Sequence, residues 1–371
     1  MNTAKYDIIK SILAYCLAGI ILSTEYDIKD LKVGVIGCGN WGKNLIRVFH
    51  ELGALTAICD IDQAKAQCYS KQYDVRSLPI EKIIQAKDVD AIVIATPSSS
   101  HFELAIQCLN ANKHLFIEKP LALSVKEAKH LCQVANNKKL TLMVGHLLQY
   151  HGHFKMLKKL KSEGALGEIQ YIYSNRFNFG KFPTEENVLW DYGPHDVSMV
   201  LSLMGLPNKV LATQGQYLHH TKADVAHIHL EFPHKKHAHI FVSWLHPFKE
   251  QKLVVVDSKA MAIFDDCQAW DQKLKLCSYP TAWVDGLPQP FPYQPTNIFV
   301  EPTEPLMSEC RHFLNCIQEK AIPTTDGAEA LRVMTVLEAA AQSIVKQNKI
   351  SLTQEKSKRD AKASTETLIE A

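Results

Sequence analysis

The sequence predicts an α/β protein: a doubly wound parallel sheet followed by a second α/β domain with a largely antiparallel, open-faced sheet. Two observations lead to this fold class. Between residues 31 and 150, short apolar runs alternate with segments of helical periodicity, which is typical of parallel strands joined by helices. After residue 150, polar and apolar residues alternate within the runs, as expected for antiparallel strands with one polar face.

A chain of 371 residues is long enough for two domains, each with its own core. We expect an N-terminal extension at 1–30, a first domain at 31–150, a second domain at 151–350 and a tail at 351–371. The tail is charged, with few large apolar residues, and we expect it to be disordered. The apolar stretch 8–22 is too short to span a bilayer comfortably and lacks a clean signal-peptide cleavage site. We therefore expect an N-terminal helix, or a mis-set translation start, and a cytoplasmic protein without a membrane partner.

Each expected element follows from its pattern and from the Gly, Pro, Ser or Asp residues at its ends. In the first domain we expect strands at 33–36, 55–59, 89–96, 114–118 and 140–144, and helices at 43–52, 61–72, 80–84, 101–111 and 123–136. In the second domain we expect strands at 169–178, 210–217, 223–232, 237–244, 252–257 and 260–265, and helices at 153–163, 194–204, 306–319 and 328–347. The last two helices are amphipathic and should return to cover the first domain, after an irregular Pro-rich segment at 280–305.

The balance of charge argues against a nucleic-acid partner, because 41 basic and 39 acidic residues leave a net charge of only +2. The ten cysteines include no C-x-x-C pair, so they are expected to be small buried side chains in a reducing compartment. The 17 histidines are not spaced with cysteines as metal ligands, and we expect no metal site.

A glycine-rich turn follows the first expected strand, where Gly37, Gly39 and Gly42 have the spacing G-x-G-x-x-G. The first glycine permits a tight turn, the second lets a pyrophosphate approach the backbone, and the third lets helix and strand pack closely. The start of the following helix offers unpaired N–H groups to phosphates. The pattern predicts a dinucleotide-binding turn; three glycines alone could also form an ordinary turn.

Asp60 ends the second expected strand, 18 residues after Gly42. A carboxylate at this place can accept hydrogen bonds from an adenosine ribose. It would also repel a 2′-phosphate, and no Arg follows it directly, so NAD is favoured over NADP. The alternative is an ordinary surface aspartate.

Hydroxyl groups follow the third expected strand, which ends at Pro97. Ser98 to Ser100 precede the helix that begins near His101. Hydroxyls and free N–H groups at a helix start suit a ribose or a phosphate, although plain N-capping needs only one of them. Ligands of a doubly wound sheet bind at the carboxyl ends of its strands, where these residues lie.

Lys119 lies in the sequence Glu118-Lys119-Pro120 at the end of the fourth expected strand. Beside a nicotinamide, its ammonium group could stabilise the alkoxide that forms as a hydride leaves the substrate. Pro120 could direct the lysine through a cis peptide bond. The alternative is a surface lysine.

Asp191 and His195 are four residues apart, which puts them on one side of a helical turn. A carboxylate near an imidazole orients it and raises its basicity, which suits removal of a proton from a sugar hydroxyl. Pro194 and Asp196 fit the first turn of the helix expected there. The alternative is that Asp191 and His195 only cap this helix.

Together these motifs resemble the Gfo/Idh/MocA oxidoreductases over roughly residues 31–350. The resemblance rests on Gly37-Cys38-Gly39-Asn40-Trp41-Gly42, Asp60, Ala95-Thr96-Pro97, Glu118-Lys119-Pro120 and Asp191-x-Gly193-x-His195. It implies a Rossmann domain, an open-faced α/β domain and NAD(P)-dependent chemistry at a carbon of a sugar or cyclitol. It further implies that Lys119 contacts nicotinamide and substrate, and that Asp191 and His195 form the acid/base pair, with His195 accepting the proton. The expected cofactor contacts are Gly37, Gly39, Asn40, Trp41, Gly42, Asp60, Thr96, Pro97, Ser98, His101, Glu118, Lys119 and Gln149.

A narrower likeness is to the branch that oxidises C3 of nucleotide-linked sugars, the UDP-N-acetylglucosaminuronate 3-dehydrogenases of surface-polysaccharide pathways. It rests on residues 145–151, 175–181, 186–191 and 304–313, and the chain departs from it at Gly152, where relatives often have Pro. Arg176, Asn178 and Lys181 could then bind a uronate carboxylate or the diphosphate. Their alternative role is solvated polarity at a strand edge.

The predicted reaction is hydride transfer from a sugar carbon, expected to be C3, to NAD. The substrate is a small molecule, expected to be nucleotide-linked, and the exposed sheet face predicts a homo-oligomer, a dimer or a tetramer. Two alternatives remain. One is an NAD-dependent glycosidase of the same family, and the other is a non-catalytic regulator that binds NAD or a sugar.

Overall fold

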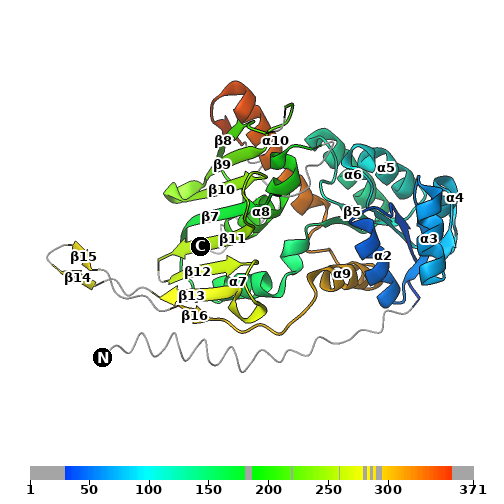
Figure 1. The fold of residues 1–371 in the computed structure, drawn as a ribbon, viewed down its shortest axis with the longest axis horizontal. Coiled ribbons are helices and arrows are strands. Elements are labelled where there is room, and N and C mark those ends of the chain that lie inside the picture. Colours follow the sequence, from blue (N-terminus) through cyan, green and yellow to red (C-terminus); the bar gives the residue numbers. More distant parts are fainter. Residues whose placement is uncertain are drawn as a thin grey trace, which may run out of the picture.

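Two sheets lie side by side in the computed structural model, each with helices packed against it (Figure 1). The structure describes residues 30–179, 186–218, 220–258, 260–278, 282–284, 287–289 and 295–352. Lys181, the expected tail from residue 353 and nearly all of the expected N-terminal extension lie outside these residues.

The first sheet has six parallel strands in the order β3-β2-β1-β4-β5-β6. The order reverses between β1 and β4, so this is the expected doubly wound parallel sheet. Its strands are β1 (Val33–Ile36), β2 (Leu55–Cys59), β3 (Arg76–Ser77), β4 (Ala91–Ile94), β5 (His114–Glu118) and β6 (Leu142–Gly145). Its helices are α2 (Gly42–Glu51), α3 (Gln63–Tyr73), α4 (Ile80–Gln85), η1 (Ser98–Ser100), α5 (His101–Asn110), α6 (Val125–Lys138) and η2 (Leu147–Tyr150).

The second sheet has nine strands in the order β16-β13-β12-β11-β7-β10-β9-β8-β17. Only β7 and β10 pair in parallel, so the expected antiparallel character is confirmed. Its strands are β7 (Ile169–Phe177), β8 (Lys209–Gly215), β9 (Val225–Glu231), β10 (His237–Ser243), β11 (Glu250–Asp257), β12 (Ala260–Asp265), β13 (Leu274–Ser278), β16 (Thr296–Asn297) and β17 (Ile350–Ser351). A separate hairpin of β14 (Ala282–Val284) and β15 (Leu287–Gln289) projects from the molecule (Figure 1).

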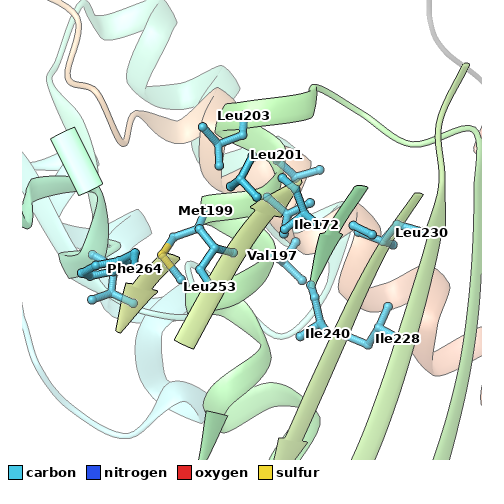
Figure 2. Packing of buried hydrophobic residues seen from close by; sticks show 14 of the residues in the cluster. Ile172, Val197, Met199, Leu201, Leu203, Ile228, Leu230, Ile240, Leu253 and Phe264 are labelled. Carbon is cyan, nitrogen blue, oxygen red and sulfur yellow. The ribbon is translucent and has the colours of Figure 1, made fainter. Parts of the chain in front are cut away.

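Helices cover one face of this sheet. They are α7 (Gly152–Ser162), α8 (Val188–Met204) and α10 (Gly327–Lys346), with the short turns η3 (Pro233–Lys235) and η4 (Trp270–Gln272) between strands. Figure 2 shows the core between α8 and the strands, where Val197 and Met199 lie among Ile172, Ile240 and Leu253. Along β7 the side chains alternate: Ile172 and Arg176 are buried on the helix side, whereas Tyr171 and Tyr173 line a hollow on the open face.

Helix α8 begins earlier than the sequence predicts. We expected it to start at Pro194, but Asn187 is the N-cap and its side chain accepts a hydrogen bond from the N–H of Trp190. Pro194 therefore lies inside the helix, and Asp191, rather than Asp196, belongs to the first turn. Asp191 and His195 still lie one turn apart, so the expected side-by-side arrangement does not depend on the start of the helix.

Helix α9 (Pro305–Glu319) returns to the first sheet, as its amphipathic pattern predicts. The ring of Phe313 packs edge-on against Phe49 of α2 and Phe116 of β5, with ring centroids 6.4 and 5.7 Å apart. The C-terminal helices thus complete the core of the N-terminal sheet and hold the two sheets together. Among the described residues, no helix is long and apolar enough to cross a membrane.

Candidate active site

The glycine turn between β1 and α2 forms one wall of the site. Gly37 has φ +101°, and a Cβ there would lie 2.5 Å from the carbonyl oxygen of Ala95. A Cβ on Gly42 would lie 1.9 Å from the carbonyl oxygen of Gly37, so helix and turn could not pack. Nothing lies within 4 Å of the Cβ position of Gly39. Gly37 and Gly42 are thus required by packing, whereas Gly39 leaves room for a ligand to approach the backbone.

The N-terminus of α2 has no side-chain cap, because Trp41 occupies the N-cap position and makes no capping hydrogen bond. The first N–H groups of a helix have no partner within the helix, and they suit a phosphate. Asn40 and Trp41 are exposed at this helix start. The turn therefore has the properties that a pyrophosphate requires.

Asp60 follows β2 and lies directly against this turn. One of its carboxylate oxygens accepts the N–H of Cys38 at 2.6 Å, and the other accepts the N–H of Asp62 at 2.8 Å. Each oxygen keeps a further lone pair for a ribose hydroxyl. Asp62 is the N-cap of α3, so the two aspartates have different roles.

The residues after β4 are largely engaged with one another. The hydroxyl of Thr96 lies 2.7 Å from that of Ser100, and Ser98 is buried after Pro97. The ring of His101 is buried, with Nε2 2.9 Å from the carbonyl oxygen of Thr96 and Nδ1 2.7 Å from that of Pro120. His101 thus connects the ends of β4 and β5. This differs from the direct cofactor contact that we expected of His101.

Glu118 ends β5 and accepts a hydrogen bond from the indole N–H of Trp41. Burial raises the pKa of Glu118 to about 7, although this hydrogen bond and the nearby Lys119 and His146 oppose the shift. A Cβ on Gly145 would lie 2.9 Å from the carboxylate of Glu118, so a side chain there would displace this carboxylate. Glu118 therefore couples the glycine turn to the strand end that carries Lys119.

Lys119 reaches from the first sheet to helix α8. Its ammonium nitrogen lies 2.8 Å from the carbonyl oxygen of Asp191 and 3.2 Å from the carboxylate oxygen Oδ1 of the same residue. The other carboxylate oxygen of Asp191 accepts the indole N–H of Trp244 at 3.2 Å. The peptide bond between Lys119 and Pro120 is cis, an arrangement that the sequence analysis had suggested.

His195 lies one turn after Asp191 on α8. Its Nδ1 is buried and has no hydrogen-bond partner among the described residues. Burial lowers the pKa of His195 well below its usual value, and the positive charges of Lys119 and Arg176, with His146, lower it further. The imidazole is therefore neutral at neutral pH and able to accept a proton. Within the described chain Asp191 is bound by Lys119 and Trp244, not by His195, so it does not orient the ring as we expected.

Arg176 of strand β7 faces α8, and its guanidinium forms an ion pair with Asp196 of that helix. Its Nε lies 2.6 Å from the carboxylate of Asp196, which also accepts the hydroxyl of Ser174. Both charged groups are buried. Asn178 follows β7 and interacts with the hydroxyl of Tyr192. Burial raises the pKa of Tyr192, and the hydrogen bond with Asn178 opposes this shift. Arg176 thus lies near His195 and Asn178 near Tyr192 of the same helix, whereas Lys181 is outside the described residues.

The side chain of Gln149, which we expected to contact the cofactor, is hydrogen-bonded to protein groups instead. Its amide nitrogen donates to the carbonyl and hydroxyl oxygens of Ser198 at 3.0 and 2.9 Å, and its amide oxygen accepts from Lys158 at 2.9 Å. The side chain is 2% exposed and has no N–H left for a dinucleotide. Gln149 instead belongs to a buried polar network that joins η2 to α7 and α8.

Two family models match the chain once its sequence is compared with those of known families. The oxidoreductase family with an NAD-binding Rossmann fold matches residues 31–146, and the Gfo/Idh/MocA C-terminal domain matches residues 154–263. The chain belongs to the Gfo/Idh/MocA family. It is accordingly an NAD(P)-binding oxidoreductase of this family, which agrees with the glycine turn, the uncapped helix start and Asp60.

Several curated Gfo/Idh/MocA proteins are similar to the chain. An inositol 2-dehydrogenase of Rhizobium meliloti is 24% identical over 343 residues, 87% of this chain and 99% of that protein. The scyllo-inositol 2-dehydrogenase (NADP(+)) IolW of Bacillus subtilis is 29% identical over 57% of this chain and 63% of that protein. The UDP-N-acetylglucosamine 3-dehydrogenase of Acidithiobacillus ferrooxidans is 28% identical over 53% of this chain and 61% of that protein.

Solved structures show the same fold. The UDP-N-acetylglucosamine 3-dehydrogenase GnnA of Acidithiobacillus ferrooxidans has a TM-score of 0.75 at 23% identity, covering 85% of this chain and 97% of that chain. An oxidoreductase of Agrobacterium radiobacter in complex with NAD+ has a TM-score of 0.75 at 18% identity, covering 87% and 98%. Identities this low establish the Gfo/Idh/MocA fold and leave the substrate to be determined.

Sequence reasoning missed several residues of this Gfo/Idh/MocA site. Trp244 binds Asp191, Asp196 binds Arg176, and the buried pair of His146 and Glu329 is hydrogen-bonded to Ser198 of α8. His146 directly follows β6, so its place at a strand end was a usable signal. Glu329 comes from a distant helix, and no local pattern indicates its partners. Among the described residues, no cluster of His, Cys, Asp or Glu has the arrangement of a metal site.

Proposed function

We propose that this protein oxidises a sugar hydroxyl, at C3 of a nucleotide-linked sugar or uronate, with NAD as the hydride acceptor. The observation that carries the proposal is the contact between Lys119 and Asp191. It joins the carboxyl edge of the dinucleotide-binding sheet to the helix that carries His195. Residues 31–150 would bind the cofactor, and residues 151–350 the substrate.

The proposed chemistry divides the hydrogen of a secondary alcohol between cofactor and protein. Bound NAD would supply the hydride acceptor, C4 of its nicotinamide, for the hydrogen on the sugar carbon. His195 takes the hydroxyl proton, and the ketone remains. Lys119 donates to the oxygen as its negative charge develops, and Asp191 holds the ammonium group in place.

The cofactor contacts follow from the same proposal. Gly37, Gly39 and Gly42 with Asn40 and Trp41 would take the pyrophosphate, and Asp60 the adenosine ribose. Thr96, Pro97, Ser98, Glu118 and Lys119 line the strand ends between that ribose and the reacting carbon. Two backbone N–H groups hold the carboxylate of Asp60 in place, and its negative charge would repel a 2′-phosphate there. This supports NAD over NADP.

The proposed substrate site lies on the second-domain side of His195. Asn178 and Lys181 would bind polar groups of the sugar nucleotide, and Arg176 would use the N–H groups that Asp196 leaves free. The likeness to a UDP-N-acetylglucosamine 3-dehydrogenase supports this choice of substrate class.

A panel of UDP- and dTDP-sugars and their uronates tests the function. We expect one of them to produce NADH, read at 340 nm, and a product that is lighter by two hydrogens in mass spectrometry. A free sugar without net NADH would instead support a glycosidase. Redox-neutral chemistry is a real alternative, because two similar curated proteins are named 2,7-anhydro-N-acetylneuraminate hydratases. Binding of NAD without turnover of any sugar would support a regulator.

The same proposal includes a homo-oligomer in the cytoplasm. The open face of the second sheet has a hollow of about 430 Å³ lined by aromatic side chains and histidines, including Tyr171, Tyr173, His229 and Phe241. A second copy would cover it. Nine cysteines in the described residues are free thiols, as a reducing compartment allows.

A further inference from the structure

His146 occupies a position at the cofactor edge that the proposed function does not use. It follows β6, whose Gly145 pairs with Glu118 of β5, so His146 stands beside Lys119 at the carboxyl edge of the sheet. The side chain is 2% exposed. A ring nitrogen without a protein partner at this edge can accept a hydrogen bond from a ligand.

One ring nitrogen of His146 has a defined partner. Its Nδ1 lies 2.6 Å from one carboxylate oxygen of Glu329, and the hydroxyl of Ser198 donates to the other at 2.7 Å. Burial works against ionisation of Glu329, but the hydrogen bonds from His146 and Ser198 help to lower its pKa. A carboxylate has no hydrogen to donate, so the hydrogen of this contact is on Nδ1.

The other ring nitrogen of His146 is therefore left as an acceptor. In a neutral imidazole with hydrogen on Nδ1, Nε2 carries the lone pair. Within the described residues Nε2 has no hydrogen-bond partner. His146 is among the neighbours that influence Glu118 and His195, so its ring lies near both of these side chains.

We propose that Nε2 of His146 accepts a hydrogen bond from the carboxamide N–H of the nicotinamide, and that Glu329 is the positioning residue that fixes this tautomer. The inference rests on binding of the cofactor in the proposed function and does not depend on the identity of the sugar. Ser198, one turn beyond His195, shares the same carboxylate. The buried carboxylate of Glu329 thus connects His146, at the cofactor edge of the sheet, to α8, the helix that carries His195.

A cofactor analogue without the carboxamide N–H tests the proposal directly. In 3-acetylpyridine adenine dinucleotide a methyl group replaces the amide nitrogen, and its affinity is compared with that of NAD by calorimetry. We expect wild type to prefer NAD, and His146→Phe to lose about two- to tenfold in NAD affinity, the range for one neutral hydrogen bond. The same variant should bind the analogue as wild type does. Equal loss for both dinucleotides, or no loss for either, would overturn the role of His146.

A matched control comes from His153, which is fully buried in the second domain and has both ring nitrogens without a partner. His153→Phe removes an imidazole to the same extent but lies away from the cofactor edge. We expect it to keep the preference of wild type for NAD over the analogue. If it loses that preference as His146→Phe does, the effect is a general loss of structure and the proposal fails.

Glu329→Gln tests the positioning role separately. The amide has nearly the shape of the carboxylate but can hydrogen-bond in either orientation, so it no longer fixes the hydrogen on Nδ1. We expect a preference for NAD between those of wild type and His146→Phe. A preference identical to that of wild type would remove Glu329 from the proposal. All readouts are binding constants, so a failed sugar panel leaves them valid, whereas absence of any dinucleotide binding would refute the proposed function itself.

Discussion

Single side chains determine what the site can do, and Lys119 is the most constrained of them. Its ammonium group makes two contacts to Asp191, which leaves one hydrogen for a substrate oxygen. Lys119→Met keeps the length of the side chain and removes the charge. We expect kcat to fall by about 10²–10³-fold, the range for loss of one group that stabilises a developing oxyanion. NAD affinity should fall far less than kcat, because Lys119 is only one of several cofactor contacts in the proposal. Steady-state kinetics with the sugar found in the panel will measure this, and a kcat within threefold of wild type would contradict the role.

His195 should give the reaction a characteristic pH dependence. The base acts in its neutral form, and its pKa is lowered well below the usual value by burial, Lys119 and Arg176. Activity is therefore present at neutral pH and lost only as the pH falls below about 6.5, the ordinary histidine value. We expect kcat/KM to stay level from pH 8 to 6.5. His195→Asn should lower the plateau by about 10²–10⁴-fold and remove the acid limb. An acid limb centred at or above 6.5 in wild type would show that another group titrates.

At the scale of elements, the turn from β1 to α2 contains one glycine needed for packing, Gly42, and one expected to serve cofactor binding, Gly39. Gly42→Ala places a Cβ 1.9 Å from the carbonyl oxygen of Gly37, so the start of the helix must move and the domain should lose stability. Gly39→Ala has nothing within 4 Å of its Cβ in the protein, so the fold should persist while the new methyl group obstructs the pyrophosphate. Thermal melting and NAD titration of both variants will distinguish the effects. Equal melting temperatures for the two variants would contradict this division.

Strand β7 and helix α8 are joined by the buried pair of Arg176 and Asp196. Asp196→Asn leaves the guanidinium buried without its charge partner, and loss of one partner of a buried pair costs about 3–5 kcal/mol. We expect a large fall in the midpoint of denaturant unfolding. Arg76→Ala removes an exposed pair with Asp88 and serves as the control, with an expected cost of at most about 1 kcal/mol. If the two variants unfold at the same denaturant concentration, Arg176 and Asp196 do not stabilise the fold.

At the scale of the whole molecule, the open face of the second sheet is not covered by any helix among the described residues. Phe241→Glu would place a charge in its hollow, beside the stacked ring of His227. In light-scattering measurements we expect wild type to be a dimer or tetramer and the variant to be monomeric. Tyr217→Glu, at an exposed position outside the hollow, should leave the oligomer intact. A wild-type monomer, or a Phe241→Glu variant with the mass of wild type, would contradict assembly through this face.

The fold was largely predictable because its signals are local. The bounds of β1, β2, β5 and β12 agree with the sequence prediction, since each is a short apolar run with clear ends. The two-residue strand β3 was missed, because nothing in so short a segment distinguishes it from a loop. The start of α8 was misplaced because Pro194 suits a first helical turn, and its tolerance within a helix depends on tertiary packing.

The candidate site was predictable only in part. Strand ends identified Lys119 and Asp60, and helical spacing identified Asp191 and His195. Partners from far along the chain complete the site: Trp244, directly after β10, binds Asp191, and Glu329 of α10 binds His146 and Ser198. Gln149 and His101, which we expected to contact the cofactor, have their polar side-chain atoms within hydrogen-bond distance of other protein atoms. Such hydrogen bonds depend on the packed structure, and the local spacing of residues in the sequence does not predict them.

The two contacts from Lys119 to Asp191 have a stereochemical consequence. A tetrahedral nitrogen with two of its bonds directed at fixed oxygens has little freedom for the third, so its direction is set before any sugar binds. We expect only one hydroxyl of a given ring, in one configuration, to meet that hydrogen and the neighbouring imidazole together. Epimers at the reacting carbon should therefore be inhibitors rather than slow substrates.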